Sequence, residues 1–479
     1  MSDVSEGTLQ EGAFIPKTYT PLAAWALSLG CTVGWGSFVM PGTTFLPVAG
    51  PLGTAIAFLI GTVAMLAVAV NYGYMARRYP GRGGVYRYVR EVFGPNHAFV
   101  CSWCLVLAYC ASMVSNATAL ALLARSVLGP VLQRGPHYLV AGYDVYLVEV
   151  FTGMVAIALV GYLCLRSARL TSLVETVLVI GLTLGILAIA VIAIVDPRVS
   201  LDSVRPGFNP HYTPLAGVFT VLASVPWAFI GFEAVTQVSG ECRFSTSKYT
   251  RIMAGAVLCG TVMYLVLNTV AAAFVPAGHD GWVAYIDDLA NLGGLDALPT
   301  FYAGYQMAGD AGLALFGITA LCAVMSGVVG FYVAATRLVR TLAADRALPH
   351  RFMALHPRFK TPAAATTIIM GITLFVPFLG RNVLSWILDL MSLGAAIAYT
   401  YVSIAVLTCA RRDGDRRMAF VGTLGSAIAL VCIALLLVPI PGLSTSLTKE
   451  TYIILVAWVA LGVNFYTPTV MRSDTTLRG

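Results

Sequence analysis

Residues 30–41 read Gly-Cys-Thr-Val-Gly-Trp-Gly-Ser-Phe-Val-Met-Pro and lie inside an apolar run from Pro21 to Val48. A run of this length is typical of a membrane-spanning helix. Each of its closely spaced glycines costs a helix about 1 kcal/mol relative to alanine. In a membrane, irregular backbone is tolerated only where it packs in protein or lines a water-filled cavity. The stretch predicts a break near 33–36 whose freed amides and carbonyls form a binding site; a small-residue packing face is the alternative.

The whole chain is strongly apolar. Of its 479 residues, 58% are hydrophobic and 11% are charged, and the mean hydropathy is +0.82. This composition predicts an all-α integral membrane protein with 12 transmembrane helices, since about twelve spans of roughly 20 residues fit the length. The expected spans are 21–48, 51–76, 97–129, 143–165, 170–195, 215–240, 251–277, 309–342, 362–380, 383–410, 419–440 and 451–471.

The net charge of +7 suggests an anionic partner such as nucleic acid, but its distribution points elsewhere. Lys and Arg occur in the short loops, about fourfold more often on the side of the termini. We therefore expect a protein of the cell membrane whose two termini are both cytoplasmic. We expect no nucleic acid partner. The loop 77–95 mixes arginines with tyrosines, which suits contact with anionic headgroups. The acidic loop 278–308 is interpreted as a lid, a vestibule or a plain solvated loop.

The expected sixth span has a second interruption at Pro226-Trp227-Ala228-Phe229-Ile230-Gly231-Phe232-Glu233. A charged Glu233 at the bilayer centre would cost about 2.5–3.5 kcal/mol, so this side chain faces the bundle interior or is protonated. Alternatively, Glu233 has a structural role and binds the backbone groups freed by the break. Broken helices five spans apart predict two inverted five-helix repeats, a pattern typical of transporters. The expected units are 1–20 as a cytoplasmic tail, 21–195 and 215–410 as the repeats, 419–471 as helices 11–12, and 472–479 as a tail.

Several motifs together resemble those of the amino acid–polyamine–organocation (APC) transporters. They are Gly34-Trp35-Gly36-Ser37-Phe38, Pro41-Gly42, Gly50-Pro51, Tyr79-Pro80 with Gly83-Gly84-Val85-Tyr86, Phe229 to Glu233, Thr336-Arg337-Leu338, Asp345 to Pro349 and Thr361-Pro362. The resemblance covers roughly 20–470. It implies the leucine-transporter-like fold, a 5+5 inverted repeat with broken helices 1 and 6, and alternating access.

The resemblance also implies a substrate site at the two breaks. A substrate carboxylate would bind amides near Gly34 to Ser37, and its ammonium would meet carbonyls near Cys31, Thr32 and Phe229 to Ile230, in agreement with helix-end electrostatics. Arginine/agmatine exchangers of the family place an asparagine, a tryptophan and a glutamate where this chain has Asn116, Trp227 and Glu233. The predicted substrate-binding residues are Cys31, Thr32, Val33, Gly34, Trp35, Gly36, Ser37, Ser112, Asn116, Trp227, Phe229, Ile230, Gly231, Glu233 and Phe331. Tyr332 is the alternative to Phe331 as an aromatic gate, a packing role is open for both, and Trp386 and Asp389 are weaker candidates.

The chain departs from the family where coupling ions bind. The span-five lysine of proton-coupled members is absent around Ile180 to Thr183, and Val328 to Phe331 stand where sodium-coupled relatives have a hydroxyl pair. Exchange, facilitated uptake and H⁺ coupling through Glu233 or Glu175 stay open. The sequence predicts a permease or exchanger for an amino acid or related amine, without cofactor or metal, whose partners are the small-molecule substrate and the lipid bilayer. The alternatives are a substrate sensor with this fold or a transporter of a polyamine or ethanolamine; a membrane enzyme is disfavoured because no ligand cluster or P-loop is present.

Overall fold

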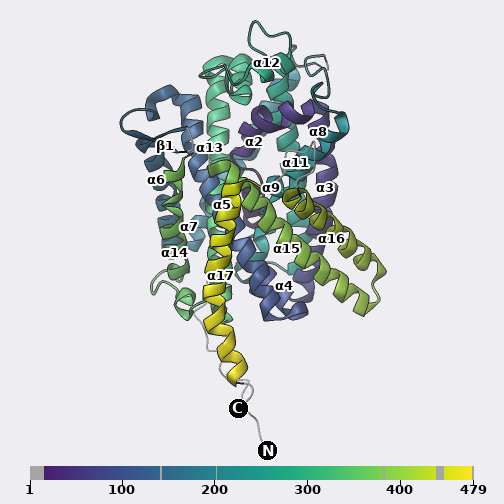
Figure 1. Ribbon diagram of the computed structural model, residues 1–479, viewed down its shortest axis with the longest axis vertical. Coiled ribbons are helices and arrows are strands. Elements are labelled where there is room, and N and C mark those ends of the chain that lie inside the picture. Colours follow the sequence, from purple (N-terminus) through teal and green to yellow (C-terminus); the bar gives the residue numbers. More distant parts are fainter. Residues whose placement is uncertain (1–15, 141–142, 201, 381–382, 439–446, 477–479) are drawn as a thin grey trace, which may run out of the picture.

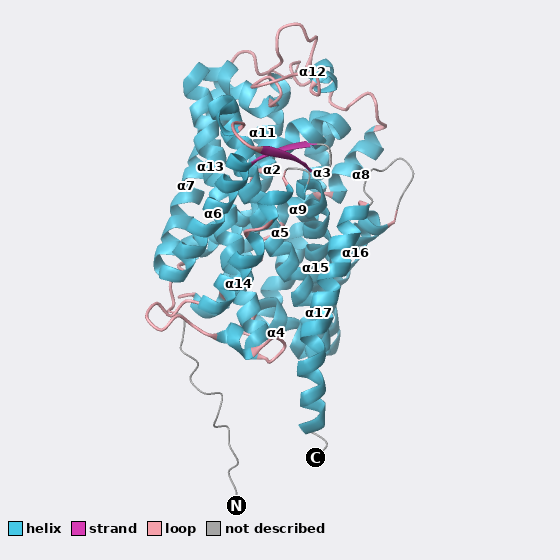
Figure 2. Ribbon diagram, turned by 60° about the vertical axis from the view of Figure 1, so that its left-hand side comes forward, coloured by secondary structure: helices cyan, strands magenta, loops and turns pink. Residues whose placement is uncertain are grey.

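The computed structural model describes residues 16–140, 143–200, 202–380, 383–438 and 447–476. Residues 1–15 and 477–479 of the two predicted tails lie outside these ranges, as do residues 439–440 of the expected eleventh span. Most of the described chain is helical, and the long helices run between two ends of the molecule (Figure 1). The α12 helix lies at one end, and α4 and the C-terminal end of α17 lie at the other (Figure 2).

The elements follow the apolar runs of the sequence. In the first half they are α1 (Pro21–Thr32), α2 (Gly36–Met40), the π-helical turn η1 (Pro41–Phe45), α3 (Leu46–Arg78), α4 (Gly84–Phe93), α5 (Pro95–Leu128), η2 (Gly129–Leu132), β1 (His137–Val140), β2 (Tyr143–Tyr146), α6 (Leu147–Arg166) and α7 (Ala168–Val195). In the second half they are α8 (Pro214–Ala223), α9 (Val225–Phe229), α10 (Ala234–Gln237), η3 (Ser239–Glu241), η4 (Thr246–Lys248), α11 (Tyr249–Ala273), α12 (Trp282–Asp288), α13 (Pro299–Ala344), η5 (His350–Met353), α14 (Ala363–Thr373), η6 (Val376–Leu379), α15 (Val383–Asp413), α16 (Arg416–Leu437) and α17 (Lys449–Thr476).

Among the described residues, eight helices are long and apolar enough to cross a membrane, and three shorter apolar helices accompany them. Two boundaries expected between a span and its neighbouring segment lie inside continuous helices of the structure. Gly50, with φ 71°, separates the first expected span from the second inside α3, and Ala308–Gly309 form a kink inside α13 where the eighth was expected to begin. The chain is therefore a multi-pass all-α membrane protein, and the count of twelve stays a prediction.

One span boundary and two loop predictions need correction. The expected fourth span begins later, because β1 and β2 form an antiparallel hairpin before α6. The loop 77–95 contains α4, whose Tyr86 and Tyr88 are buried in the protein and do not face headgroups. The acidic loop contains α12, anchored by the fully buried Trp282, so it is not a plain solvated loop. The segment expected as a C-terminal tail, 472–479, is helical as far as Thr476, and its cytoplasmic location stays a prediction.

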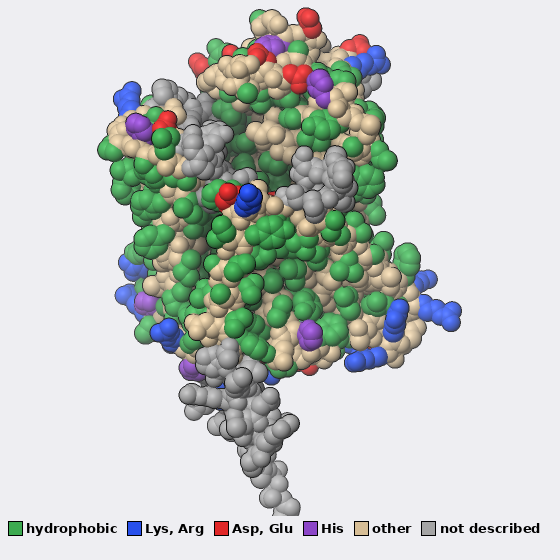
Figure 3. Space-filling model, in the orientation of Figure 1, with side chains coloured by type: hydrophobic (Ala, Val, Ile, Leu, Met, Phe, Trp, Pro, Cys, Tyr) green, Lys and Arg blue, Asp and Glu red, His purple; other side chains and the backbone are tan. Residues whose placement is uncertain are grey.

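Burial separates central helices from peripheral ones. In α5, 83% of the most apolar window is buried, whereas the value is 33% for α7 and for α16. The exposed side chains of the peripheral helices are large and apolar, such as Ile194 and Val431. On the face drawn in Figure 3, apolar side chains cover the middle of the molecule, acids gather at the α12 end, and most Lys and Arg lie lower down. The exposed apolar side chains of the peripheral helices suit contact with lipid, and α5 passes through the interior beside the breaks described next.

Candidate functional site

The first break separates α1 from α2. The Thr20 hydroxyl accepts a hydrogen bond from the Ala23 amide and starts α1, which ends where Val33 adopts extended backbone (φ −111°, ψ 96°). Helical geometry returns at Trp35, and the Ser37 amide donates to the Gly34 carbonyl at 3.2 Å. The predicted break at 33–36 is therefore confirmed. Val33 is fully buried, so the irregular backbone packs inside the protein.

The second break lies between α9 and α10. Ile230 is extended (φ −52°, ψ 137°), and Gly231 takes φ +96°, a conformation that L side chains rarely adopt. The Phe229 carbonyl accepts a hydrogen bond from the Phe232 amide at 3.3 Å. The predicted interruption is confirmed, and it extends over 230–233.

The two breaks face each other in the interior. A Cβ atom at Gly231 would overlap the Cys31 side chain, and one at Gly36 would overlap the Trp227 ring. The rings of Trp35 and Trp227 meet edge to face, with centroids 6.3 Å apart. Glycine at these positions is what permits the close approach of α1 and α2 to α9 and the residues after it.

Asn116 in α5 contacts the first break directly. Its Oδ1 accepts a hydrogen bond from the Trp35 amide at 3.2 Å, and its Nδ2 donates to the Ser112 carbonyl at 2.9 Å. The Ser112 hydroxyl donates to the Ala108 carbonyl of its own helix. Asn116 therefore joins α5 to the break, whereas Ser112 contributes a carbonyl that orients Asn116.

Glu233 lies at the centre of the second break and is fully buried. Its carboxylate accepts hydrogen bonds from the Tyr109 hydroxyl at 2.9 Å, the Gly231 amide at 3.1 Å and the Tyr399 hydroxyl at 3.2 Å. The interior-facing prediction is confirmed. The hydrogen bond from the Gly231 amide corresponds to the structural role considered for Glu233, in which the carboxylate binds a freed backbone group. The two tyrosines hold the carboxylate in place.

The remaining predicted residues divide into two groups. Phe331 packs beside Gly231 and Tyr109, at the second break. Tyr332 instead donates its hydroxyl to the Thr366 carbonyl at 2.9 Å, toward α14. Asp389 accepts a hydrogen bond from Thr451 of α17. Of the two proposed aromatic gates, only Phe331 contacts the breaks, and Asp389 is turned toward the twelfth expected span.

Three polar residues at the breaks were missing from the sequence prediction. The Ser115 hydroxyl accepts a hydrogen bond from Trp35 Nε1 at 2.7 Å, and Tyr109 and Tyr399 bind Glu233. Ser115 is adjacent to Asn116, and Tyr109 lies two helical turns before Asn116. The sequence signal that could have identified these two residues is a polar side chain in an apolar helix, close to the predicted Asn116. Tyr399 had no such signal.

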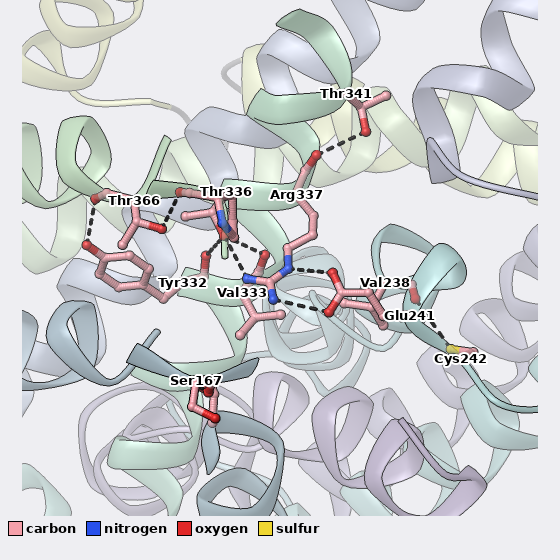
Figure 4. A network of polar contacts seen from close by, with 12 residues as sticks. Ser167, Val238, Glu241, Cys242, Tyr332, Val333, Thr336, Arg337, Thr341 and Thr366 are labelled. Atoms are coloured by element: carbon pink, nitrogen blue, oxygen red, sulfur yellow. Dashed lines mark hydrogen bonds and ion pairs between the residues drawn. The ribbon is translucent and has the colours of Figure 1, made fainter. Parts of the chain in front are cut away.

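A buried ion pair joins α13 to η3 (Figure 4). Arg337 of α13 donates to both carboxylate oxygens of Glu241, at 2.9 and 3.2 Å, and both side chains are 5% exposed. The Glu241 carbonyl accepts hydrogen bonds from the amides of Thr18 and Tyr19. This contact ties α13, η3 and the segment before α1 together.

The ten cysteines are all free thiols. In the described ranges, no three His, Cys, Asp or Glu side chains form a group that could hold a metal ion. The chemical groups gathered at the breaks are therefore backbone amides and carbonyls, an amide side chain, hydroxyls, indoles and one buried carboxylate.

Comparisons with known proteins identify the family of the chain. Residues 19–463 match the family described as amino acid permease. The chain is 25% identical to the branched-chain amino acid permease BcaP of Bacillus subtilis, over 92% of this chain and 90% of that protein. It is 24% identical to the methylthioribose transporter of B. subtilis, over 94% and 93% of the two chains. It is 25% identical to human cationic amino acid transporter 4, over 80% of this chain and 58% of the human protein.

The family match spans nearly the whole described chain and includes both breaks. With its multi-pass architecture, the chain belongs to the amino acid permease family of the APC superfamily, whose members are transporters.

Proposed function

We propose that the protein is a secondary transporter that carries an amino acid with a neutral side chain across the cell membrane by alternating access. Its twelve spans would form two inverted five-helix repeats followed by two further helices, with both termini in the cytoplasm. The observation that carries this proposal is the contact between the two helix breaks, where Gly231 lies against Cys31 in the buried interior.

The first break supplies the groups for a carboxylate. The amide of Trp35 points at an acceptor oxygen, and the start of α2 concentrates amides next to it. Amides at a helix start favour anions, and carbonyls at a helix end favour cations. The substrate carboxylate would bind near Gly34 to Ser37. Its ammonium would bind the carbonyls at the end of α1 and at Ile230.

The side-chain preference follows from the aromatic groups around the breaks. Trp35, Trp227 and Phe331 supply apolar surface, and Trp227 Nε1 is buried without a hydrogen-bond partner among the described residues. Glu233, the acid at this place, is engaged by three donors. A carboxylate offers about four acceptor positions, so the three donors leave Glu233 at most one position for a cationic substrate side chain. A neutral side chain needs none.

The test is uptake by the purified full chain in proteoliposomes. The panel contains labelled L-leucine, L-valine, L-lysine, L-arginine and methylthioribose, which covers the substrates named in the relatives. Uptake of the neutral amino acids at least tenfold above empty liposomes is expected. Uptake of methylthioribose or of the cationic amino acids alone would contradict the proposed substrate, and uptake of none by a folded protein would contradict the function.

A further inference from the structure

Glu175 of α7 is a second buried acid beside the first break, and its surroundings differ from those of Glu233. It is 1% exposed, and neither carboxylate oxygen has a hydrogen-bond partner among the described residues. Buried polar groups in native proteins are nearly always hydrogen-bonded, so an exception calls for an explanation. Nothing in the site described above uses this side chain.

Two glycines make room for the Glu175 carboxyl between three helices. A Cβ atom at Gly30 of α1 would overlap Oε1, and one at Gly330 of α13 would lie 3.3 Å from the same oxygen. Gly30 lies one turn before the break at Val33. The carboxyl is therefore enclosed by α7, α1 and α13 at the point where α1 loses its helical backbone.

No cation reaches this carboxyl within the described chain. Arg337 of α13 lies seven residues beyond Gly330, about 10 Å along the helix axis, and both of its hydrogen bonds to an acid go to Glu241. From α11, Tyr264 turns to the Thr32 carbonyl. Three titratable side chains also lie within electrostatic range of Glu175, namely Tyr19 on the segment before α1, Cys31 on α1 and Cys164 on α6.

An ionised carboxylate in this place would be strongly unfavourable, because burial removes its hydration and no donor or cation replaces it. A metal ion would need several further oxygen ligands. Besides Glu175, the side chains nearest the two glycines are Leu27, Val179, Cys31 and Ser326, and the Ser326 hydroxyl donates its hydrogen bond to the Ala323 carbonyl of its own helix. A proton is the ligand that neutralises the carboxyl without additional oxygens.

We propose that Glu175 is the proton-binding site of this transporter, protonated while α1 packs against α7 and α13 and deprotonated when α1 moves away. One O–H bond forms as the carboxylate takes a proton from the side of lower pH. The same bond breaks as the proton leaves on the other side, and no electrons are transferred. A proton that binds one conformation more tightly shifts the equilibrium toward it, which couples the proton gradient to the motion of α1. This coupling role depends on the proposed function.

The first test needs no transport. Infrared spectra of the purified full chain in detergent are recorded as the pH is raised, to follow the carbonyl stretch of protonated carboxyl groups. A band that disappears during the titration is expected in the wild type, in Glu175→Asp at a shifted position, and in the exposed control Glu91→Gln. It should be missing in Glu175→Gln. The same titrating band in a folded Glu175→Gln protein would overturn the proposal, as would no such band in the wild type.

The second test uses labelled L-leucine in proteoliposomes. Counterflow into vesicles preloaded with unlabelled L-leucine measures exchange, and an inward proton gradient measures coupling. We expect Glu175→Gln to keep counterflow within about twofold of the wild type, while its gradient-driven accumulation falls at least tenfold and Glu175→Asp keeps part of it. Unchanged accumulation in Glu175→Gln, or accumulation driven by a sodium gradient at equal pH alone, would overturn the proposal. If the wild type transports no member of the panel, the proposed function fails, and the infrared band still decides the protonation of Glu175.

Discussion

Asn116 Oδ1 accepts a hydrogen bond from the Trp35 amide at 3.2 Å, although 81 positions separate the two residues. The amide of the first break is therefore already bound by a neutral oxygen from α5. A carboxylate is a stronger acceptor than an amide oxygen, with bonds to donors roughly twice as strong. We infer that the substrate carboxylate displaces Asn116 Oδ1 and that Asn116 then becomes a side-chain ligand.

The substitution Asn116→Asp tests this exchange. It keeps the shape of the side chain but puts an acid, which repels another carboxylate when it is ionised, at the place proposed for the substrate carboxylate. We expect the apparent KM for L-leucine to rise about 10- to 100-fold, which corresponds to roughly 1.4–2.8 kcal/mol. Asn116→Ala should raise it less, because only a hydrogen bond worth about 0.5–1.5 kcal/mol is lost. An unaltered KM in both variants would remove Asn116 from the site.

Gly231 and Gly278 form a matched pair for the second break. Both have φ +96°, but a Cβ atom at Gly231 would overlap Cys31, whereas one at Gly278 meets nothing within 4 Å. Alanine imposes the same backbone strain of about 1–2 kcal/mol at both positions. We expect Gly231→Ala to lower uptake at least tenfold at normal expression and Gly278→Ala to lower it less than twofold. Equal uptake in the two variants would show that contact between the breaks is dispensable.

Glycine and proline made the two breaks predictable, because their backbone preferences act locally and need no knowledge of distant residues. Gly34, Gly36 and Gly231 could be interpreted in this way. The residues that contact the breaks from other helices could not be predicted from the sequence. Tyr399 reaches Glu233 from α15, 166 positions away, and only the packing of α15 against α9 and α5 brings them together.

The two intramembrane acids illustrate the same limit. Glu233 and Glu175 are both isolated acids in apolar sequence, and both remained open as proton sites. The difference between their environments becomes visible only in the folded structure, where Glu233 accepts three hydrogen bonds and Glu175 accepts none from the described residues. The tyrosines of α4 were misplaced for a related reason, because Tyr86 and Tyr88 are buried by tertiary contacts that the sequence does not reveal.

The substitution Glu233→Gln tests which of the two acids, Glu233 or Glu175, is responsible for the pH dependence of uptake. The glutamine NH₂ group would face one of the three donors that now bind the carboxylate, so at least one buried hydrogen bond is lost at a cost of about 1–3 kcal/mol. We expect lower uptake and a lower melting temperature in detergent, with the pH dependence of the residual uptake unchanged. Tyr399→Phe, which removes one of the same hydrogen bonds, serves as the comparison. A shifted pH profile in Glu233→Gln but not in Tyr399→Phe would assign the titration to Glu233.

Two tryptophans attach the last helix to the centre of the molecule. Trp103 Nε1 donates to the Trp458 carbonyl at 3.0 Å, Trp458 Nε1 donates to the Trp103 carbonyl at 3.1 Å, and the rings stack with centroids 4.5 Å apart. Trp458→Phe keeps a ring but removes one donor, so we expect a loss of about 1 kcal/mol and a melting temperature lower by a few degrees. Uptake should persist, since the described side chains of α17 pack against α5 and α15 and away from the breaks. Loss of uptake at unchanged melting temperature would contradict a purely structural role.

Glu241→Gln tests whether the buried ion pair holds the α4 end closed. Removing one charge leaves the Arg337 guanidinium buried without its partner, which costs about 3–5 kcal/mol. Asp345→Asn is the control, because its pair with Arg90 is largely exposed and should contribute about 0–1 kcal/mol. We expect Glu241→Gln to lower the melting temperature markedly and to make the buried Cys242 reactive toward a thiol probe, identified by mass spectrometry. Equal melting temperatures in both variants, with Cys242 still protected, would mean that the ion pair does not keep this end of the protein closed.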